Sequence, residues 1–183
     1  GRTPVKTALS SMGRMGEVVD HLRGALAEGR QAYWVCPLVD ESETLDLTAA
    51  EERFKALRAA LGDHVVGLVH GQMPDADRDE AMARFVSGET KVLVATTVIE
   101  VGVDVPNASI MVIGRAESFG LAQLHQLRGR VGRGAAASTC LLLFQAPLSE
   151  SGRKRLEIMR ETDDGFRIAE EDLAMRGAGD LLG

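Results

Sequence analysis

The sequence predicts a three-layer α/β domain built around a parallel sheet. Its expected strands are continuous apolar runs without polar alternation, which is the pattern of strands covered on both faces. Segments with helical periodicity separate these runs, as they do in a parallel sheet with helices on both sides. The composition agrees, because 45% of the 183 residues are hydrophobic and 26% are charged, values close to the average for soluble domains.

The N-terminal third contains two expected helices with a strand between them. Residues 17–28 place apolar side chains on one helical face. The run 31–38 is apolar and contains Pro37 near its end, so it is expected to be a buried strand. Residues 47–61 carry a second apolar stripe at helical spacing, and Gly62 ends that helix.

The same alternation continues through the middle of the chain. The apolar runs 65–69 and 91–95 each predict a strand. Between them, residues 75–86 predict a helix that begins after Pro74 and ends at Ser87-Gly88.

The alternation ends with a strand expected at residues 109–113, a helix at 121–128 and a strand at 139–144. The segment 149–183 differs, because it is highly charged and carries apolar residues at helical spacing. We expect a helical extension there that ends in a loop at 176–180. The chain therefore divides into a sheet domain at residues 1–148 and an extension at 149–183.

Composition excludes several classes of protein. The net charge of −6 argues against binding nucleic acid through bulk positive charge alone, although a local basic cluster could do so. No apolar run is long enough to cross a membrane, and residues 1–6 lack the apolar region of a signal peptide. The first residue is not Met, so we expect a piece of a longer chain. Cys36 and Cys140 are expected to be free, buried thiols of a cytosolic protein, and the four histidines are too scattered to bind a metal.

Familiar catalytic motifs are either in the wrong context or missing. Asp79-Glu80-Ala81 resembles a nucleotide-hydrolysis box but falls inside an amphipathic helix, where its carboxylates would face solvent. Ser118 lies in an approximate nucleophile elbow, but the only later histidine is inside the next helix, so we expect Ser118 to cap that helix. The acidic stretch 40–46 is expected to be a solvated loop. No G-x-x-x-x-G-K-[ST] phosphate loop occurs among the 20 glycines, so this chain alone should not hydrolyse a nucleotide.

The informative stretch is 126–134, which packs three arginines and three glycines between a helix and a strand. A helix end needs one glycine and no guanidinium groups. Arg130 and Arg133 are three residues apart and project to one side of a helical turn. Two forked cations on glycine-rich backbone suit an anion that gains charge as it reacts, which is how an arginine finger acts on a phosphoryl group. Arg128 either belongs to this group or is structural, paired with a carboxylate.

Here the sequence resembles a known superfamily. The pattern Q-x-x-G-R-x-G-R at 126–133 is similar to motif VI of superfamily 2 helicases, whose motor consists of two RecA-like lobes that close on ATP. Residues 92–106 resemble motif V, and the segment 69–73 resembles the His-Gly turn of the same lobe. Their order and context imply a RecA-like second lobe, which would explain the missing phosphate loop.

The resemblance narrows to the RecG family of bacterial ATP-dependent branch-migration helicases. Segments 31–43, 119–134 and 164–177 are similar to that family, and the similarity covers essentially residues 1–183. The extension at 149–183 resembles the start of the translocation motif that this family shares with the transcription-repair coupling factor Mfd. The end of that motif, including its Gln, is missing here.

The resemblance implies an ATP site shared with the other lobe. Arg130 and Arg133 would reach the γ-phosphate bound there, and Gln126 would orient that contact. Gly102 and Asp104 would lie at the cleft, with Asp104 near the nucleotide or its attacking water. The alternative for Asp104 is a turn residue.

The resemblance also implies contacts to DNA. Thr96 and Thr97 would contact a DNA phosphate through hydroxyl and backbone groups, and His70 and Gly71 would do the same from the neighbouring loop. Such contacts position DNA without reading its sequence. Arg176 would couple lobe closure to the displacement of duplex DNA.

The implied function is that of the second motor lobe of a DNA helicase that remodels stalled forks and Holliday junctions. The first lobe would bind most of the ATP and Mg²⁺, and no metal site is expected in this chain. The expected partners are branched DNA and, within the same chain, the N-terminal lobe and the wedge domain. The protein is expected to be a monomer that works in the bacterial cytoplasm, associated with the nucleoid and not with a membrane. Two alternatives remain: the equivalent lobe of Mfd, and a non-motor module that binds an anion or RNA.

Overall fold

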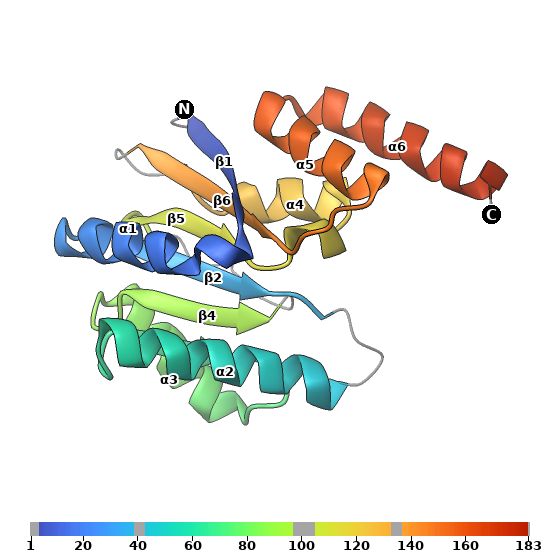
Figure 1. Ribbon diagram of the computed structural model, residues 1–183. Helices are drawn as coiled ribbons and strands as arrows, with labels where there is room; N and C mark the ends of the chain where they lie inside the picture. The colour runs from blue at the N-terminus through green and yellow to red at the C-terminus, as the bar shows by residue number, and fades with distance from the viewer. Residues whose placement is uncertain (1–3, 39–42, 97–104, 133–136, 183) are drawn as a thin grey trace.

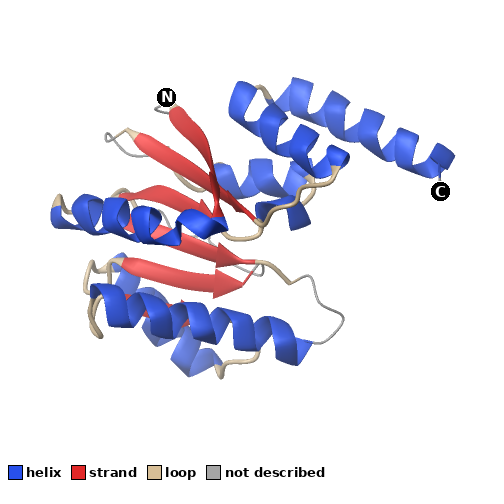
Figure 2. Cartoon of the chain, viewed as in Figure 1, coloured by secondary structure: helices blue, strands red, loops and turns tan. Residues whose placement is uncertain are grey.

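The computed structural model describes residues 4–38, 43–96, 105–132 and 137–182. Within them, a parallel sheet lies between two layers of helices (Figure 1). The strands are β1 (Val5–Ser11), β2 (Gln31–Cys36), β3 (Val66–Val69), β4 (Val92–Thr96), β5 (Ala108–Ile113) and β6 (Ser138–Phe144). The helices are α1 (Met15–Ala27), α2 (Glu43–Leu61), α3 (Asp75–Val86), α4 (Leu121–Arg128), α5 (Glu150–Glu161) and α6 (Gly165–Leu182), with short 3-10 helices η1 (Met12–Arg14) and η2 (Ala116–Ser118). Strands and helices alternate through most of the sheet domain (Figure 2), although no helix is described between β4 and β5, and the predicted α/β fold is confirmed.

The strands follow the order β1-β6-β5-β2-β4-β3, and each neighbouring pair is parallel. Parallel strands bring their carboxyl ends to one edge, where open α/β sheets bind ligands. The register decides which strand ends are neighbours. Val69 pairs with Ala95, and Val35 pairs with both Ala95 and Ile113.

A hydrophobic core lies on each face of the sheet. On one face α1 and α2 supply Leu22 and Leu57 to the cluster that contains Trp34. On the other face α3, α4, α5 and α6 contribute to the cluster that contains Tyr33, whose ring centroid lies 5.0 Å from that of Phe85. Because neighbouring residues of one strand point to opposite faces, both must be apolar, and this explains why the strands lack polar alternation.

The structure differs from the sequence-based expectation at two elements far apart in the chain. β1 was not predicted, because polar residues interrupt it and, as an edge strand, it is only partly buried. α6 continues to Leu182, so the loop expected at 176–180 is wrong. Glycine costs a helix about 1 kcal/mol relative to alanine, and the packing of α6 on α4, with Ile168 in the core, offsets that cost.

Two local expectations are also wrong. Ser118 does not cap α4, because it belongs to η2, and the cap position is Gly120, whose N–H donates to Gln123 Oε1 at 3.0 Å. Asp46 does not lie in a solvated loop, because it belongs to α2 and is buried. Both errors come from assigning residues by type without knowing where the neighbouring helix begins.

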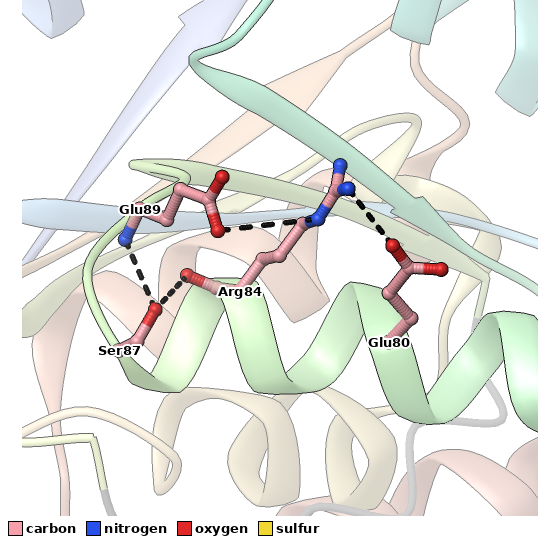
Figure 3. A network of polar contacts seen from close by, with 4 residues as sticks. All are labelled: Glu80, Arg84, Ser87 and Glu89. Carbon is pink, nitrogen blue, oxygen red and sulfur yellow. Dashed lines mark hydrogen bonds and ion pairs between the residues drawn. The ribbon is translucent and has the colours of Figure 1, made fainter.

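The carboxylates of Asp79 and Glu80 are exposed on α3, as expected. Figure 3 shows how Glu80 is used: its Oε1 accepts a hydrogen bond from Arg84 Nη2 at 2.8 Å, and Arg84 Nε lies 4.0 Å from Glu89 Oε2. Ser87 closes the same helix end, since its Oγ donates to Arg84 O and accepts from Glu89 N. Exposed ion pairs of this kind contribute about 0 to 1 kcal/mol, and here they lie at the C-terminal end of α3.

Both cysteines are free and buried, as predicted. Burial raises the pKa of the Cys36 thiol to about 11 and that of Cys140 to about 12, although Arg53 and Arg128 respectively oppose the shift. Both thiols therefore stay protonated at neutral pH. A protonated thiol is a poor nucleophile and a poor metal ligand, so neither cysteine is a candidate catalytic group.

The buried amide of Gln31 joins the sheet to the end of α3. Its Nε2 donates to Phe85 O at 2.7 Å and to Thr90 O at 3.0 Å. Gln31 lies at the start of β2, where its backbone N–H also donates to Asn107 O at 2.7 Å. Because a buried carbonyl without a partner is costly, this single side chain holds the α3–β4 turn against the central strand.

We expect Gln31→Leu to lower the free energy of unfolding by about 1 to 3 kcal/mol, because Thr90 O loses the donor described here and Phe85 O keeps only the backbone N–H of Gly88. Urea denaturation followed by circular dichroism measures the change. Gln145→Leu is the matched control, since Gln145 is exposed and its substitution should stay within about 0.5 kcal/mol of the wild type. Equal stability of the two variants would contradict this role for Gln31.

Candidate functional site

The proposed DNA-contacting residues lie at the carboxyl ends of two adjacent strands. His70 and Gly71 follow β3, and Thr96 ends β4. The pairing of Val69 with Ala95 places His70 and Thr96 at equivalent positions on neighbouring strands. The structure therefore brings together three of the four residues that the sequence assigns to DNA.

The His70 turn presents groups that can donate hydrogen bonds to a phosphate. His70 Nδ1 accepts a hydrogen bond from Gln72 N at 3.2 Å. A neutral ring held in this way carries its proton on Nε2, which is then available as a donor. Gly71 is exposed, and a Cβ placed on it would meet nothing within 4 Å, so its backbone is open to approach. Thr96 is buried, so only the end of its strand can be approached from outside.

A second group of candidate residues lies at the C-terminal end of α4. Gln126 is exposed and Arg130 is half-buried. The backbone turns tightly here, since Arg130 N donates to Leu127 O at 3.1 Å and Val131 N to Arg128 O at 3.3 Å. Val131 is buried in the core and anchors the turn. We call residues 129–132 the finger turn.

Glycine is required at one position of the finger turn. Gly132 has φ 87°, in the left-handed region that disfavours residues with a side chain. Gly129 has φ −67°, an ordinary helical value, and caps α4 through its N–H to His125 O. One glycine of this stretch, Gly129, caps the helix. A second, Gly132, is needed because of its left-handed backbone conformation.

Arg128 is the structural member of the arginine cluster. Its side chain is buried, and Nη1 donates to Met159 O at 2.6 Å and to Thr7 Oγ1 at 3.2 Å. Nη2 donates to Thr162 O at 3.0 Å. The sequence left open an anion-binding role or a structural one with a carboxylate. The partners of Arg128 include two backbone carbonyls and a hydroxyl, and its Nη2 also lies 3.5 Å from His125 Nδ1. Arg128 thus fastens the residue before the finger turn to β1, α5 and the α5–α6 connection.

Arg176 lies on α6, on the helical extension. It is exposed, and its Nε lies 3.1 Å from Asp172 Oδ2 one helical turn earlier. α6 packs on α4, and its Ile168 belongs to the same core cluster as Leu124 of α4. The extension that carries Arg176 is therefore in direct contact with the helix that leads into the finger turn.

Four of the predicted site residues, Thr97, Gly102, Asp104 and Arg133, lie outside the described residues. Their assignments stay predictions.

Sequence reasoning missed one residue at the carboxyl edge, Arg115. It follows β5 and is exposed, with φ 46° and ψ 51°. This left-handed conformation is uncommon for residues other than glycine and asparagine. The signal that could have found it is a lone cation directly after an apolar strand, at the end where ligands bind.

In the described part of the chain, no group of three or more His, Cys, Asp or Glu side chains could hold a metal ion. Among the helices that the structure describes, none is both long and apolar enough to span a bilayer. A groove of about 550 Å³ lies between α1 and strands β1, β5 and β6, and none of the predicted site residues lines it.

The chain matches the family of the helicase conserved C-terminal domain over residues 15–135. It therefore belongs to that family. It is 57% identical over 183 residues to the ATP-dependent DNA helicase RecG of Acidithiobacillus ferridurans and 55% identical over 184 residues to RecG of Escherichia coli strain K12. Each comparison covers 100% of this chain and 27% of the relative, so the chain spans about a quarter of the length of these proteins.

Solved structures agree with this assignment. The structure of RecG bound to a three-way DNA junction superposes with a TM-score of 0.81 at 42% identity, over 98% of this chain and 23% of that one. Domain 2 of the DEAD-box helicase Mss116p, solved with an RNA duplex, superposes with a TM-score of 0.62 at 20% identity, over 78% of this chain and 55% of that one. The second likeness shows the fold alone. The first confirms the resemblance to a RecG C-terminal helicase lobe.

The burial of Arg128 leads to a test of stability. Arg128→Met is expected to lower the free energy of unfolding by about 2 to 4 kcal/mol, because it removes charge-assisted hydrogen bonds and leaves buried carbonyl groups unsatisfied. Arg128→Lys should recover only part of the loss, since an ammonium group cannot reproduce the forked geometry.

Urea denaturation measures the effect of both Arg128 variants. The control is Arg160→Met, which removes an exposed guanidinium from α5 and should change stability by less than about 0.5 kcal/mol. If Arg128→Met were as stable as this control, Arg128 would not fasten α4 to α5.

Proposed function

We propose that this chain is the second motor lobe of a RecG-type DNA helicase that uses ATP to remodel branched DNA such as stalled forks and Holliday junctions. The observation that supports it most strongly is the similarity to RecG proteins along the whole chain. That similarity favours RecG over the Mfd lobe or a non-motor anion- or RNA-binding module. The working protein would contain a first lobe and a wedge domain, act as a monomer, and operate in the bacterial cytoplasm at the nucleoid.

In this proposal ATP and Mg²⁺ are bound mainly by the first lobe. Arg130 and Arg133 contribute guanidinium groups to the γ-phosphate, with Gln126 orienting the contact and Gly102 and Asp104 at the cleft. Their charge stabilises the transferring phosphoryl group. Without the first lobe, this chain should show no ATP hydrolysis.

DNA contacts in this proposal come from the carboxyl edge of the sheet. His70 and Gly71 after β3, Thr96 at the end of β4, and Thr97, the next residue in the sequence, hold backbone phosphates. Phosphate contacts do not depend on base sequence, which a motor that moves along any duplex requires. The net charge of −6 means that binding has to be local to this edge.

Arg133→Ala in the full-length protein is expected to reduce ATP turnover by about 10³-fold or more, because an arginine finger contributes roughly 10³ to 10⁵. Arg130→Ala should act in the same direction and less severely. Phosphate release at saturating forked DNA measures turnover, and anisotropy of the labelled fork measures DNA affinity, which should change little. Arg160→Ala removes an exposed arginine elsewhere and should leave both intact. Loss of DNA affinity with normal turnover would show that the cluster binds a different ligand.

Arg176 tests whether the extension couples ATP hydrolysis to movement of DNA. Arg176→Ala in the full-length protein should keep DNA-stimulated hydrolysis within a few-fold while strand displacement on a fork fails. Asp172→Asn is the matched control, because it removes the ion pair of Arg176 but keeps the cation, and it should preserve both activities. Phosphate release and strand displacement are measured on the same substrate in one buffer. Normal unwinding by Arg176→Ala, or equal loss of both activities, would exclude a coupling role.

A further inference from the structure

The carboxyl ends of β2 and β5 lie side by side where the chain changes direction. β5 pairs with β2 in the centre of the sheet. The chain leaves β2 toward α2, on one face, and leaves β5 through η2 toward α4, on the other (Figure 1). Adjacent parallel strands whose connections diverge in this way leave a crevice outside their carboxyl ends, and open α/β sheets bind their ligands there.

Arg115 is held at the edge of this crevice in an unfavourable backbone conformation. Gly114 N donates to Val35 O at 2.9 Å, which ties the residue before Arg115 to β2. Ser118 N donates to Arg115 O at 2.9 Å, which ties the carbonyl of Arg115 itself to η2. Between these two bonds Arg115 adopts φ 46°. Conformations of this kind persist only where the surroundings fix them, and they concentrate at functional sites.

The guanidinium of Arg115 is available to a ligand. The side chain is exposed and has no hydrogen-bond or ion-pair partner within the described ranges of the chain. Two other arginines differ: Arg155 Nη2 donates to Glu117 O at 2.8 Å, and Arg14 Nε lies 3.1 Å from Glu17 Oε2. An exposed guanidinium whose backbone is held in place and that has no acceptor is suited to bind an anion.

An apolar side chain lies at the end of the adjacent strand. Leu38 follows β2 and is 45% exposed, although most large aliphatic side chains of this sheet are buried. The last pair in the register of β2 and β5 is Val35 with Ile113, so Leu38 and Arg115 lie three and two residues beyond it, at the same edge of the sheet. A cation and an exposed aliphatic side chain at one edge match the two parts of a nucleotide, a phosphate and a flat apolar base.

We propose that Arg115 binds a nucleotide phosphate at the crevice between β2 and β5, with Leu38 against the sugar or base. The proposal rests on the motor function proposed above, and it adds a phosphate contact outside the finger turn and outside the β3–β4 edge. A DNA strand and an ATP molecule both carry this chemistry. The experiment therefore has one arm for each source.

The test uses the full-length protein and two substitutions of the same residue. Arg115→Asn removes the charge and suits the left-handed backbone, so it should fold normally. Arg115→Lys keeps the charge in the same backbone position. Lys55→Gln, which removes an exposed cation from α2, is the control for net charge. Thermal unfolding of each variant confirms that it is folded.

The first arm measures the affinity for a fluorescein-labelled forked DNA at several salt concentrations. If Arg115 binds a DNA phosphate, Arg115→Asn should weaken binding about tenfold and reduce the slope of log K against log salt by about one, while Arg115→Lys keeps the slope. The second arm measures the KM for ATP at saturating DNA. If Arg115 binds ATP, Arg115→Asn should raise this KM about tenfold and leave the salt slope unchanged.

Either result supports the proposal that Arg115 binds a phosphate, and it shows whether that phosphate belongs to DNA or to ATP. The proposal is overturned if Arg115→Asn behaves like Lys55→Gln in both arms, or if the Asn and Lys variants lose the same affinity in the DNA arm. A wild-type protein that neither binds the fork nor hydrolyses ATP in its presence would overturn the proposed motor function instead. The two failures are therefore distinguishable.

Discussion

Burial of the central strand β2 on both faces is the constraint from which the arrangement of this domain follows. All six of its residues are buried, and their side chains alternate between the two cores. Since neither face of this strand can meet water, helices must cover both. The chain leaves β2 toward α2 on one face and the neighbouring β5 toward α4 on the other. The coverage of both faces therefore goes with a change in chain direction at the carboxyl edge, the kind of place where open α/β sheets bind ligands.

Buried strands and amphipathic helices could be predicted because their signals are local. Helix α3 has the bounds that its periodicity indicates, Asp75–Val86, and the inner strands deviate by a residue or two. β1 could not be predicted in this way, because it is an edge strand with polar residues and its partner Ser138–Phe144 is far along the chain. α6 was misjudged at Gly177 because contacts with α4, which the local sequence does not reveal, stabilise a helix with poor propensity.

In the candidate site, too, local sequence predicts some features and long-range contacts decide the others. The arginine-rich stretch predicts an anion contact, and the structure places Arg130 on a rigid turn after α4. The sequence could not decide the role of Arg128, because its acceptors Met159 and Thr162 are 31 and 34 residues away. Arg115 was missed for a related reason, since its importance lies in a backbone angle and in which strand lies beside β5. Residue types indicate the chemistry, whereas long-range contacts determine which of several similar side chains is available for it.

The strand order also governs how the domain can assemble during synthesis. β1 is made first, yet its only partner in the described sheet is β6, the last strand to be made, with Val5 opposite Ser138. The inner strands can pair earlier, because β2, β4 and β5 are closer together in the chain. On the ribosome, β1 must therefore wait with its hydrogen-bonding groups exposed until nearly the whole sheet domain has emerged. Closing so long a loop is slow and entropically costly.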